Sequence, residues 1–212
     1  MGTFLKGILG GFSGRIGTVI GANWRGLDVM RSRPRKSNRA ATEEQLQQRL
    51  KFGLVSKFLA PISPLLRLKY GQPEEAKSRR NLAVSYHVLE AVTGTYPDYA
   101  INYPLVIITK GELAGFQAPE AVAAPGSTIA FTWVDNTGLA LAYADDQMVA
   151  VVYNAARKEF KHEQTALRSE AGYNFSLPAN WAAEKVHCWI SFTSANGKMQ
   201  SNSIYMGELT LL

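Results

Sequence analysis

Residues 128–154, TIAFTWVDNTGLALAYADDQMVAVVYN, decide how the second half of this chain folds. Two runs in this stretch alternate large apolar side chains with other residues. The alternating side chains are Ile129, Phe131 and Trp133 in the first run and Val149, Val151 and Tyr153 in the second. Successive side chains of a strand point to opposite faces. Each run therefore predicts a β-strand with one buried face, and the Asp145-Asp146 pair between them predicts a solvated turn.

Similar β-prone runs recur about every ten residues on both sides of this stretch, with turn residues such as Pro125-Gly126 and Asn196-Gly197 between them. Regular short strands with turn signals are typical of an antiparallel sandwich. We therefore expect an immunoglobulin-like β-sandwich over residues 112–212 that folds by itself. Its expected strands are residues 116–122, 128–134, 139–143, 148–154, 173–177, 186–193 and 203–211.

Residues 41–111 predict a small helical region. Thr42 and Gln45 have capping-box spacing, and a helix from about 43 to 59 follows. Prolines and glycines then delimit helices near 65–70 and 74–92, and a buried strand is expected at 105–108. Leu46, Leu50, Leu54 and Phe58, joined by Val55 and Leu59, are the predicted buried face of the first helix, and Leu82, Tyr86 and Leu89 that of the third.

Residues 1–40 predict a glycine-rich basic arm. Eight glycines occur before residue 27, which is too many for a helix because each interior glycine costs about 1 kcal/mol relative to alanine. Residues 15–35 instead predict a β-hairpin with its turn at 23–26. Two strands alone are marginally stable in water. We expect either the rest of the chain or a neighbouring subunit to complete this hairpin.

Charge is distributed unevenly along the chain. Residues 1–110 contain 17 Lys and Arg against 7 Asp and Glu, whereas residues 111–212 contain 6 against 10. This asymmetry favours either nucleic-acid binding by the basic half or head-to-tail association between copies. The residues predicted to contact a neighbouring copy or phosphate groups are Arg15, Trp24, Arg25, Arg31, Arg33, Arg35, Lys36 and Arg39.

No motif predicts catalysis, a cofactor or a metal site. The N-terminal glycines do not form a dinucleotide-binding or phosphate-binding motif. The three histidines are scattered, and the one cysteine, Cys188, lies in an alternating apolar run that predicts a buried thiol. Residues 4–12 are too short to span a bilayer and no signal peptide is recognisable, so we expect no membrane span and a cytoplasmic protein or part of a released particle.

Several segments resemble a family of bacterial proteins known only as a domain of unknown function. They are FSGRIGTVIGANWRG, MRSRPRKSNRAATEEQLQQRLKF, NLAVSYH, TWVDN, YADDQMVAVVYN and SNSIYMGEL. The resemblance covers nearly the whole chain, and it implies no established activity and no catalytic residue. A looser resemblance to small phage-associated proteins covers about forty N-terminal residues and implies a structural role in an assembly.

The predicted fold is therefore α+β, with an N-terminal hairpin arm (1–40), a helical region (41–111) and an immunoglobulin-like sandwich (112–212). The leading functional hypothesis is a non-enzymatic structural subunit that assembles with itself, as a filament, ring or coat, through its N-terminal arm. The alternatives are a nucleic-acid-binding protein that uses residues 31–39, and a ligand-binding or enzymatic sandwich.

Overall fold

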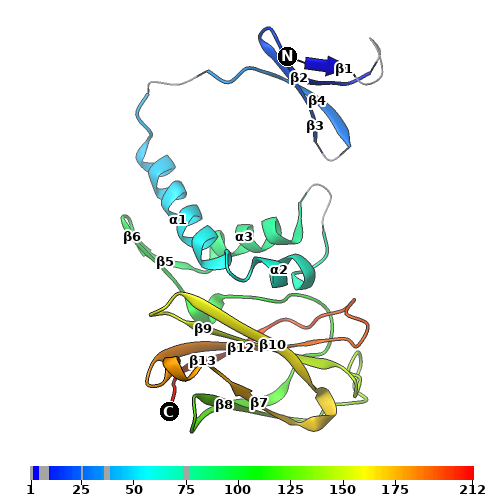
Figure 1. Cartoon of the computed structure of the whole chain (residues 1–212), viewed down its shortest axis with the longest axis vertical. Helices are drawn as coiled ribbons and strands as arrows, with labels where there is room; N and C mark the ends of the chain where they lie inside the picture. Colours follow the sequence, from blue (N-terminus) through cyan, green and yellow to red (C-terminus); the bar gives the residue numbers. More distant parts are fainter. Residues whose placement is uncertain (1, 5–9, 25, 36–38, 74–76) are drawn as a thin grey trace. The chain divides into compact units, whose positions relative to one another are not determined.

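The computed structural model describes residues 2–4, 10–24, 26–35, 39–73 and 77–212 (Figure 1). The chain divides into two compact units, Met1–Thr42 and Glu43–Leu212. The first unit is a four-stranded antiparallel sheet with the order β1-β2-β3-β4. Its strands are β1 (Gly2–Phe4), β2 (Phe12–Ile16), β3 (Val19–Trp24) and β4 (Leu27–Ser32).

The predicted hairpin is present, and it is part of a larger sheet. Strands β3 and β4 pair from Val19↔Ser32 to Trp24↔Leu27, around the predicted turn. Ile16 and Val19, both within the predicted hairpin, belong to different strands because Gly17 turns the chain with a φ of +57°. Gly21 is also required, because a Cβ there would lie 2.6 Å from the Phe12 ring. The chain's own N-terminal residues thus complete the hairpin.

The second unit contains three α-helices, a short hairpin and two larger antiparallel sheets. The helices are α1 (Glu43–Leu59), α2 (Ser63–Lys69) and α3 (Arg79–Glu90), and the short hairpin is β5 (Val92–Thr95) and β6 (Asp98–Ile101). One sheet has the order β10-β9-β12-β13 and the other β11-β8-β7. These strands are β7 (Gln117–Ala124), β8 (Thr128–Val134), β9 (Gln147–Asn154), β10 (Glu159–Leu167), β11 (Gly172–Ser176), β12 (Lys185–Thr193) and β13 (Ile204–Thr210), with 3₁₀ turns η2 (Tyr103–Leu105), η3 (Arg168–Glu170) and η4 (Ala179–Trp181).

The two larger sheets enclose one hydrophobic core. It contains the alternating residues of β8, together with Met148, Ala150 and Val152 of β9 and apolar residues of β12. Ile129, Phe131 and Trp133 are all buried, which confirms the predicted inward face of that strand. Burial of alternate residues on facing strands stabilises this pair of sheets through the hydrophobic effect.

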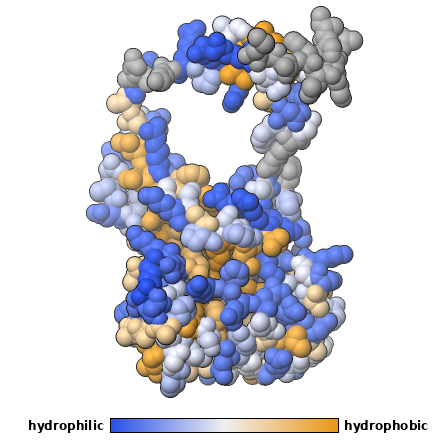
Figure 2. Space-filling view, in the orientation of Figure 1, coloured by the Kyte–Doolittle hydropathy of each residue, from blue (hydrophilic) through white to orange (hydrophobic). Residues whose placement is uncertain are grey.

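A second hydrophobic core lies on the other face of the four-stranded sheet, under the helices. Val149, Val151 and Tyr153 of β9 pack there with Val55 and other buried residues of the helical region. Both faces of β9 are therefore buried, whereas the sequence predicts only one. The result is three layers, helices over the four-stranded sheet over the three-stranded sheet (Figure 1). Hydrophobic surface is visible where the helical layer meets the strands (Figure 2).

Helices α1 and α2 begin and end near their predicted positions, whereas α3 (Arg79–Glu90) is shorter than the predicted helix at 74–92, of which residues 74–76 lie outside the described residues. The buried faces of α1 and α3 agree with the prediction in part. Helix α1 spans 43–59 as expected, yet Leu46 and Leu50 are exposed and the buried residues are Val55, Phe58 and Leu59. Only the last turns of this helix contact the core. Helix α3 begins at Arg79 because the Ser78 hydroxyl accepts a hydrogen bond from the backbone N–H of Asn81 (3.3 Å). Its buried residues are Ala83, Val84 and His87. Of the predicted face, Leu82 and Tyr86 are half-buried against the core, and Leu89 is 75% exposed.

Two predicted strands are absent from the structure, and one strand of the larger sheets was not predicted. Residues 105–108 are buried in part but form no strand, because side chains rather than a neighbouring strand accept hydrogen bonds from their backbone: Ile107 N donates to His87 Nε2 and Ile108 N to Ser203 Oγ. Residues 139–143 form turns. Strand β10 has no counterpart in the prediction, because it is a mostly polar edge strand without an apolar alternation.

The predicted boundary between residues 111 and 112 separates helices from the strands of the larger sheets, but the two parts share a core. Residues 55–108 and strands β9 and β12 all contribute to the cluster under the helices. The compact units divide at residue 42 instead. The helical region and the sheets therefore form one unit.

Candidate functional site

Two of the predicted contact residues lie in one row across the N-terminal sheet. Arg15 on β2 is opposite Ile20 on β3, and Ile20 is opposite Arg31 on β4. Residues directly opposite each other in an antiparallel sheet share a face. Both arginines are exposed, and they flank Ile20 on the same side of the sheet.

Arg33 continues this row of positive charge beyond the end of β4. Its backbone N–H donates to the carbonyl oxygen of Thr18 at 2.8 Å, which extends the pairing of β3 and β4 by one residue. Strand alternation then places Arg33 on the same face as Arg31. Arg35 and Arg39 are exposed after β4, and neither of these two residues is in a helix or strand. Arg25 and Lys36 lie outside the described residues.

Trp24 lies on the same face, at the closed end of the hairpin. It is opposite Leu27, and the two side chains are 51% and 63% exposed. The turn between them is held by Asn23, whose Oδ1 accepts a hydrogen bond from Gly26 N (3.0 Å) and whose Nδ2 donates to Asp28 Oδ1 (2.9 Å). We call Arg15, Trp24, Leu27, Arg31 and Arg33 the arginine–tryptophan face.

The N-terminal sheet has little hydrophobic burial of its own. Among the described residues 10–42, no hydrophobic side chain is buried, and all six residues of β4 are exposed. The exposed apolar side chains of β4 are Leu27, Val29 and Met30, the last with 70% of its surface accessible. This sheet therefore presents both charge and apolar surface for an interaction.

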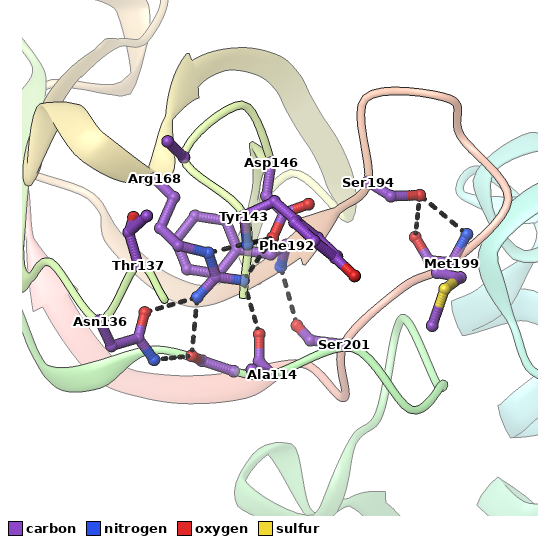
Figure 3. A network of polar contacts seen from close by, with 12 residues as sticks. Ala114, Asn136, Thr137, Tyr143, Asp146, Arg168, Phe192, Ser194, Met199 and Ser201 are labelled. Atoms are coloured by element: carbon purple, nitrogen blue, oxygen red, sulfur yellow. Dashed lines mark hydrogen bonds and ion pairs between the residues drawn. The ribbon is translucent and has the colours of Figure 1, made fainter. Parts of the chain in front are cut away.

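A buried ion pair in the second unit was not predicted from the sequence. Arg168 and Asp146 have side chains that are 0% and 1% exposed, and Arg168 Nη2 lies 2.9 Å from Asp146 Oδ2 (Figure 3). The remaining guanidinium hydrogens are donated to Asp146 Oδ2, to Asn136 Oδ1 and to the carbonyl oxygens of Ala114 and Gly115. All five N–H donors have acceptors, so this arginine has no donor left for a ligand.

Two further contacts of Arg168 also indicate that its role is to stabilise the fold. Its guanidinium carbon lies 3.9 Å from the centroid of the Phe192 ring, and its backbone carbonyl accepts a hydrogen bond from Trp133 Nε1 (2.9 Å). Asp146 Oδ2 also accepts from the backbone N–H of Tyr143 (2.9 Å). The prediction of a solvated turn at 145–146 is confirmed for Asp145, which is exposed, and is wrong for Asp146, which is buried. No spacing in the sequence links residue 146 to residue 168.

The buried histidines and the cysteine have structural roles in the described part of the chain. The Nδ1 of His87 contacts the carbonyl oxygen of Ala83 at 2.7 Å and its Nε2 accepts from Ile107 N, which defines a neutral imidazole with the proton on Nδ1. Burial lowers the pKa of His87 and raises the pKa of Cys188 to about 12. The described residues contain no group of three His, Cys, Asp or Glu side chains placed to hold a metal ion. None of the helices described is long and apolar enough to cross a membrane.

The protein is therefore a mainly antiparallel β-protein, with a helical layer on one sheet and a second compact unit at its N-terminus. A family model matches residues 11–207, and the chain belongs to that family, described as a family of unknown function (DUF6266). The predicted family resemblance is therefore confirmed. No curated protein matches the sequence. The looser resemblance to phage-associated proteins stays a prediction.

Two solved structures are similar to part of the chain. One is a family 76 glycoside hydrolase from a bovine Bacteroides thetaiotaomicron strain, with a TM-score of 0.38 and 13% identity over 47% of this chain. The match covers only 21% of that enzyme. The other is the fn3 domain of human collagen alpha-1(XX) chain, with a TM-score of 0.35 and 14% identity over 47% of this chain and 88% of that domain.

Proposed function

We propose that the protein is a non-enzymatic structural subunit that assembles with itself through its N-terminal unit. The observation that carries this proposal is a four-stranded sheet in which no hydrophobic side chain of the described residues 10–42 is buried. Small sheets become stable when a hydrophobic face or a free edge is covered. A neighbouring copy would provide that cover.

The outer strand β4 supports assembly by strand addition. In the described residues it pairs only with β3. The hydrogen bond from Arg33 N to Thr18 O makes Thr18 and Arg33 a hydrogen-bonded pair of the β3–β4 ladder. Along an antiparallel ladder, hydrogen-bonded pairs alternate with pairs whose backbone groups point away from each other. The backbone groups of Asp28, Met30 and Ser32 therefore point away from β3. An exposed edge with apolar side chains is a template for pairing with another chain.

The distribution of charge supports a head-to-tail arrangement. Residues 1–42 contain eight basic residues and one acidic residue, whereas residues 111–212 have an excess of acidic ones. The turns at 135–146 expose Asp135 and Asp145 beside Leu139 and Tyr143, which are 61% and 54% exposed. This acidic and apolar surface complements the arginine–tryptophan face of a second copy. A heterologous contact of this kind forms rings or filaments rather than closed dimers.

We also propose that strands β7–β13 of the second unit form an immunoglobulin-like sandwich. Strands β7–β13 form sheets of three and four strands around a shared core, with seven strands in all between residues 117 and 210. An immunoglobulin-like sandwich has this number of strands and this two-sheet core. The proposed β7–β13 sandwich would serve as the body of the subunit, with the helices as one additional layer.

Replacing Met30 by proline or by threonine tests the assembly proposal. Proline removes an outward N–H of β4 without removing a bond to β3, while threonine retains the N–H and changes the side chain. In size-exclusion chromatography with light scattering, we expect the native protein and Met30→Thr to assemble and Met30→Pro to elute as a 23.3 kDa monomer. A native protein that is monomeric at every concentration, or a proline variant that assembles equally well, would contradict the proposal.

Nucleic-acid binding is a second candidate, and the arginine–tryptophan face favours it. Aligned arginines can bind phosphates while an exposed tryptophan stacks on a base. Fluorescence anisotropy with a single-stranded oligonucleotide should then give a steep salt dependence, with a log–log slope that decreases by about 0.7 for each phosphate contact removed. Arg31→Gln should reduce that slope, and Lys161→Gln, at an exposed site on β10, should leave it unchanged. Binding that is insensitive to both salt and Arg31→Gln would rule this candidate out.

A further inference from the structure

A groove in the second unit has no role in the proposed assembly. It lies where helix α3 faces two loops, residues 109–112 and 196–202, and its volume is about 620 Å³. Pockets that bind small organic ligands have volumes of roughly 300–1,000 Å³. The groove is therefore large enough for a small molecule or for the end of a peptide.

Backbone contacts hold the walls of this groove in place before any ligand binds. Gly71 N donates to Lys110 O at 2.8 Å, and Leu113 N donates to Gln200 O at 3.0 Å. Gly111 lies so close to the second loop that a Cβ would stand 2.2 Å from Gln200 O, so only glycine fits there. A preformed site avoids the entropic cost of ordering its walls on binding.

Tyr70 is one of the residues that line the groove, and its buried hydroxyl is unsatisfied. Tyr70 is 2% exposed, and its hydroxyl has no hydrogen-bond partner among the described residues. Burial raises the pKa of this phenol, so it remains a protonated donor at neutral pH. A buried hydroxyl without a partner is unfavourable, and nearly all such groups in proteins are satisfied by protein, water or ligand. An oxygen atom of a ligand would supply the missing acceptor.

The other groups that line the groove divide into a cationic set and an apolar set. Lys110 and Lys198 are exposed, and their amino groups make no ion pair or hydrogen bond with the described residues, while Glu112 is the one acidic residue among the lining side chains. Leu89 and Met199 provide apolar surface, and Leu89 is 75% exposed. Two lysines and one glutamate leave a net charge of one positive unit, which matches a ligand with a single negative charge.

We propose that this groove binds an amphipathic organic monoanion, a carboxylate carried on an apolar or aromatic body. The carboxylate accepts hydrogen bonds from Lys110, Lys198 and the Tyr70 hydroxyl. The body of the ligand covers Leu89 and Met199, which removes apolar surface from water. The same chemistry is present in a free organic acid and in the C-terminal residue of a peptide.

Saturation-transfer difference titrations on the full-length chain test this site with 3-phenylpropanoate as the probe. We expect saturable binding of this carboxylate and binding at least tenfold weaker for 3-phenylpropan-1-ol, which lacks the charge. Tyr70→Phe and Lys198→Gln should each weaken carboxylate binding roughly tenfold, as expected for loss of a hydrogen bond to a charged group. Lys161→Gln makes the same change of charge on the exposed face of β10 and should leave the dissociation constant unchanged.

Thermal unfolding of the Tyr70→Phe variant shows whether a lost signal reflects loss of the fold. The hydroxyl has no partner in the protein, so we expect an unchanged or higher unfolding temperature. A tripeptide that ends in leucine, compared with its C-terminal amide, then distinguishes the sources. Tighter binding of the acid peptide than of 3-phenylpropanoate indicates a peptide terminus, and weaker binding indicates a free organic acid. Equal binding of carboxylate and alcohol, or unchanged binding in both variants, would overturn the proposal.

Discussion

Asp145 and Asp146 are adjacent in the sequence and have opposite roles in the structure. Asp146 is buried against Arg168, while Asp145 is exposed. Removing one partner of a buried ion pair leaves an unpaired buried charge, which typically costs about 3–5 kcal/mol. We expect Asp146→Ala to lower the free energy of unfolding by about that amount in urea titrations. Asp145→Ala is the matched control and should change it by less than about 0.5 kcal/mol; similar effects of both substitutions would show that the pair is not structural.

We expect the buried thiol of Cys188 to make the free energy of unfolding decrease at alkaline pH. Its folded-state pKa is raised to about 12 from its usual value of 9.0, so above pH 9 the unfolded chain releases this proton while the folded protein retains it. The stabilising effect is thus complete below pH 9 and is lost between pH 9 and 12, at up to about 1.4 kcal/mol per pH unit. Between pH 9 and 10, urea unfolding should show this loss together with that of the tyrosines whose pKa burial also raises, among them Tyr70 and Tyr153. Cys188→Ala should make the slope shallower by the cysteine's share, and an unchanged slope would assign the loss to the other groups.

In helix α1, local sequence signals predict the first and last residues of the helix but not the whole of its buried face. The bounds 43–59 follow from the cap, the acidic first turn and the proline after the helix, and these local signals are present in the sequence. The buried face depends on which turns the sheet contacts, so Leu50 is 44% exposed and Leu59 is fully buried. Only the tertiary contacts distinguish the two leucines.

The two leucines provide a matched test on this one helix. We expect Leu59→Ala to destabilise the protein by about 2–5 kcal/mol, because it leaves a cavity in the core. Leu50→Ala should cost less than about 1 kcal/mol, since its side chain is already partly in water. Chemical denaturation of both variants at one temperature compares them directly. Equal losses would mean that the first turns of α1 are also covered in solution, as they would be in an assembly.

At the scale of the whole molecule, the two cores predict which fragments fold. A fragment of residues 43–212 retains both cores, whereas residues 112–212 alone would expose Val149, Val151, Tyr153 and Trp189 to water. The sequence predicts that residues 112–212 fold alone, and the shared core leads us to expect the opposite. Calorimetry should show one cooperative transition for 43–212 and a broad or absent transition for 112–212. A sharp transition of the shorter fragment would support the original boundary.

Most helices and strands of this protein follow from local properties of the chain, because capping, turns and alternation each depend on residues close together in the sequence. The sequence predicted the three helices, the β3–β4 hairpin and most strands of the two larger sheets. What covers each face of these elements depends on contacts between residues that are distant in the chain. Both faces of β9 are apolar, and nothing local shows that helices cover one of them. The pairing of Arg168 with Asp146, the alignment of Arg15 with Arg31 and the unsatisfied Tyr70 hydroxyl likewise arise from contacts between residues distant in the chain or on different strands.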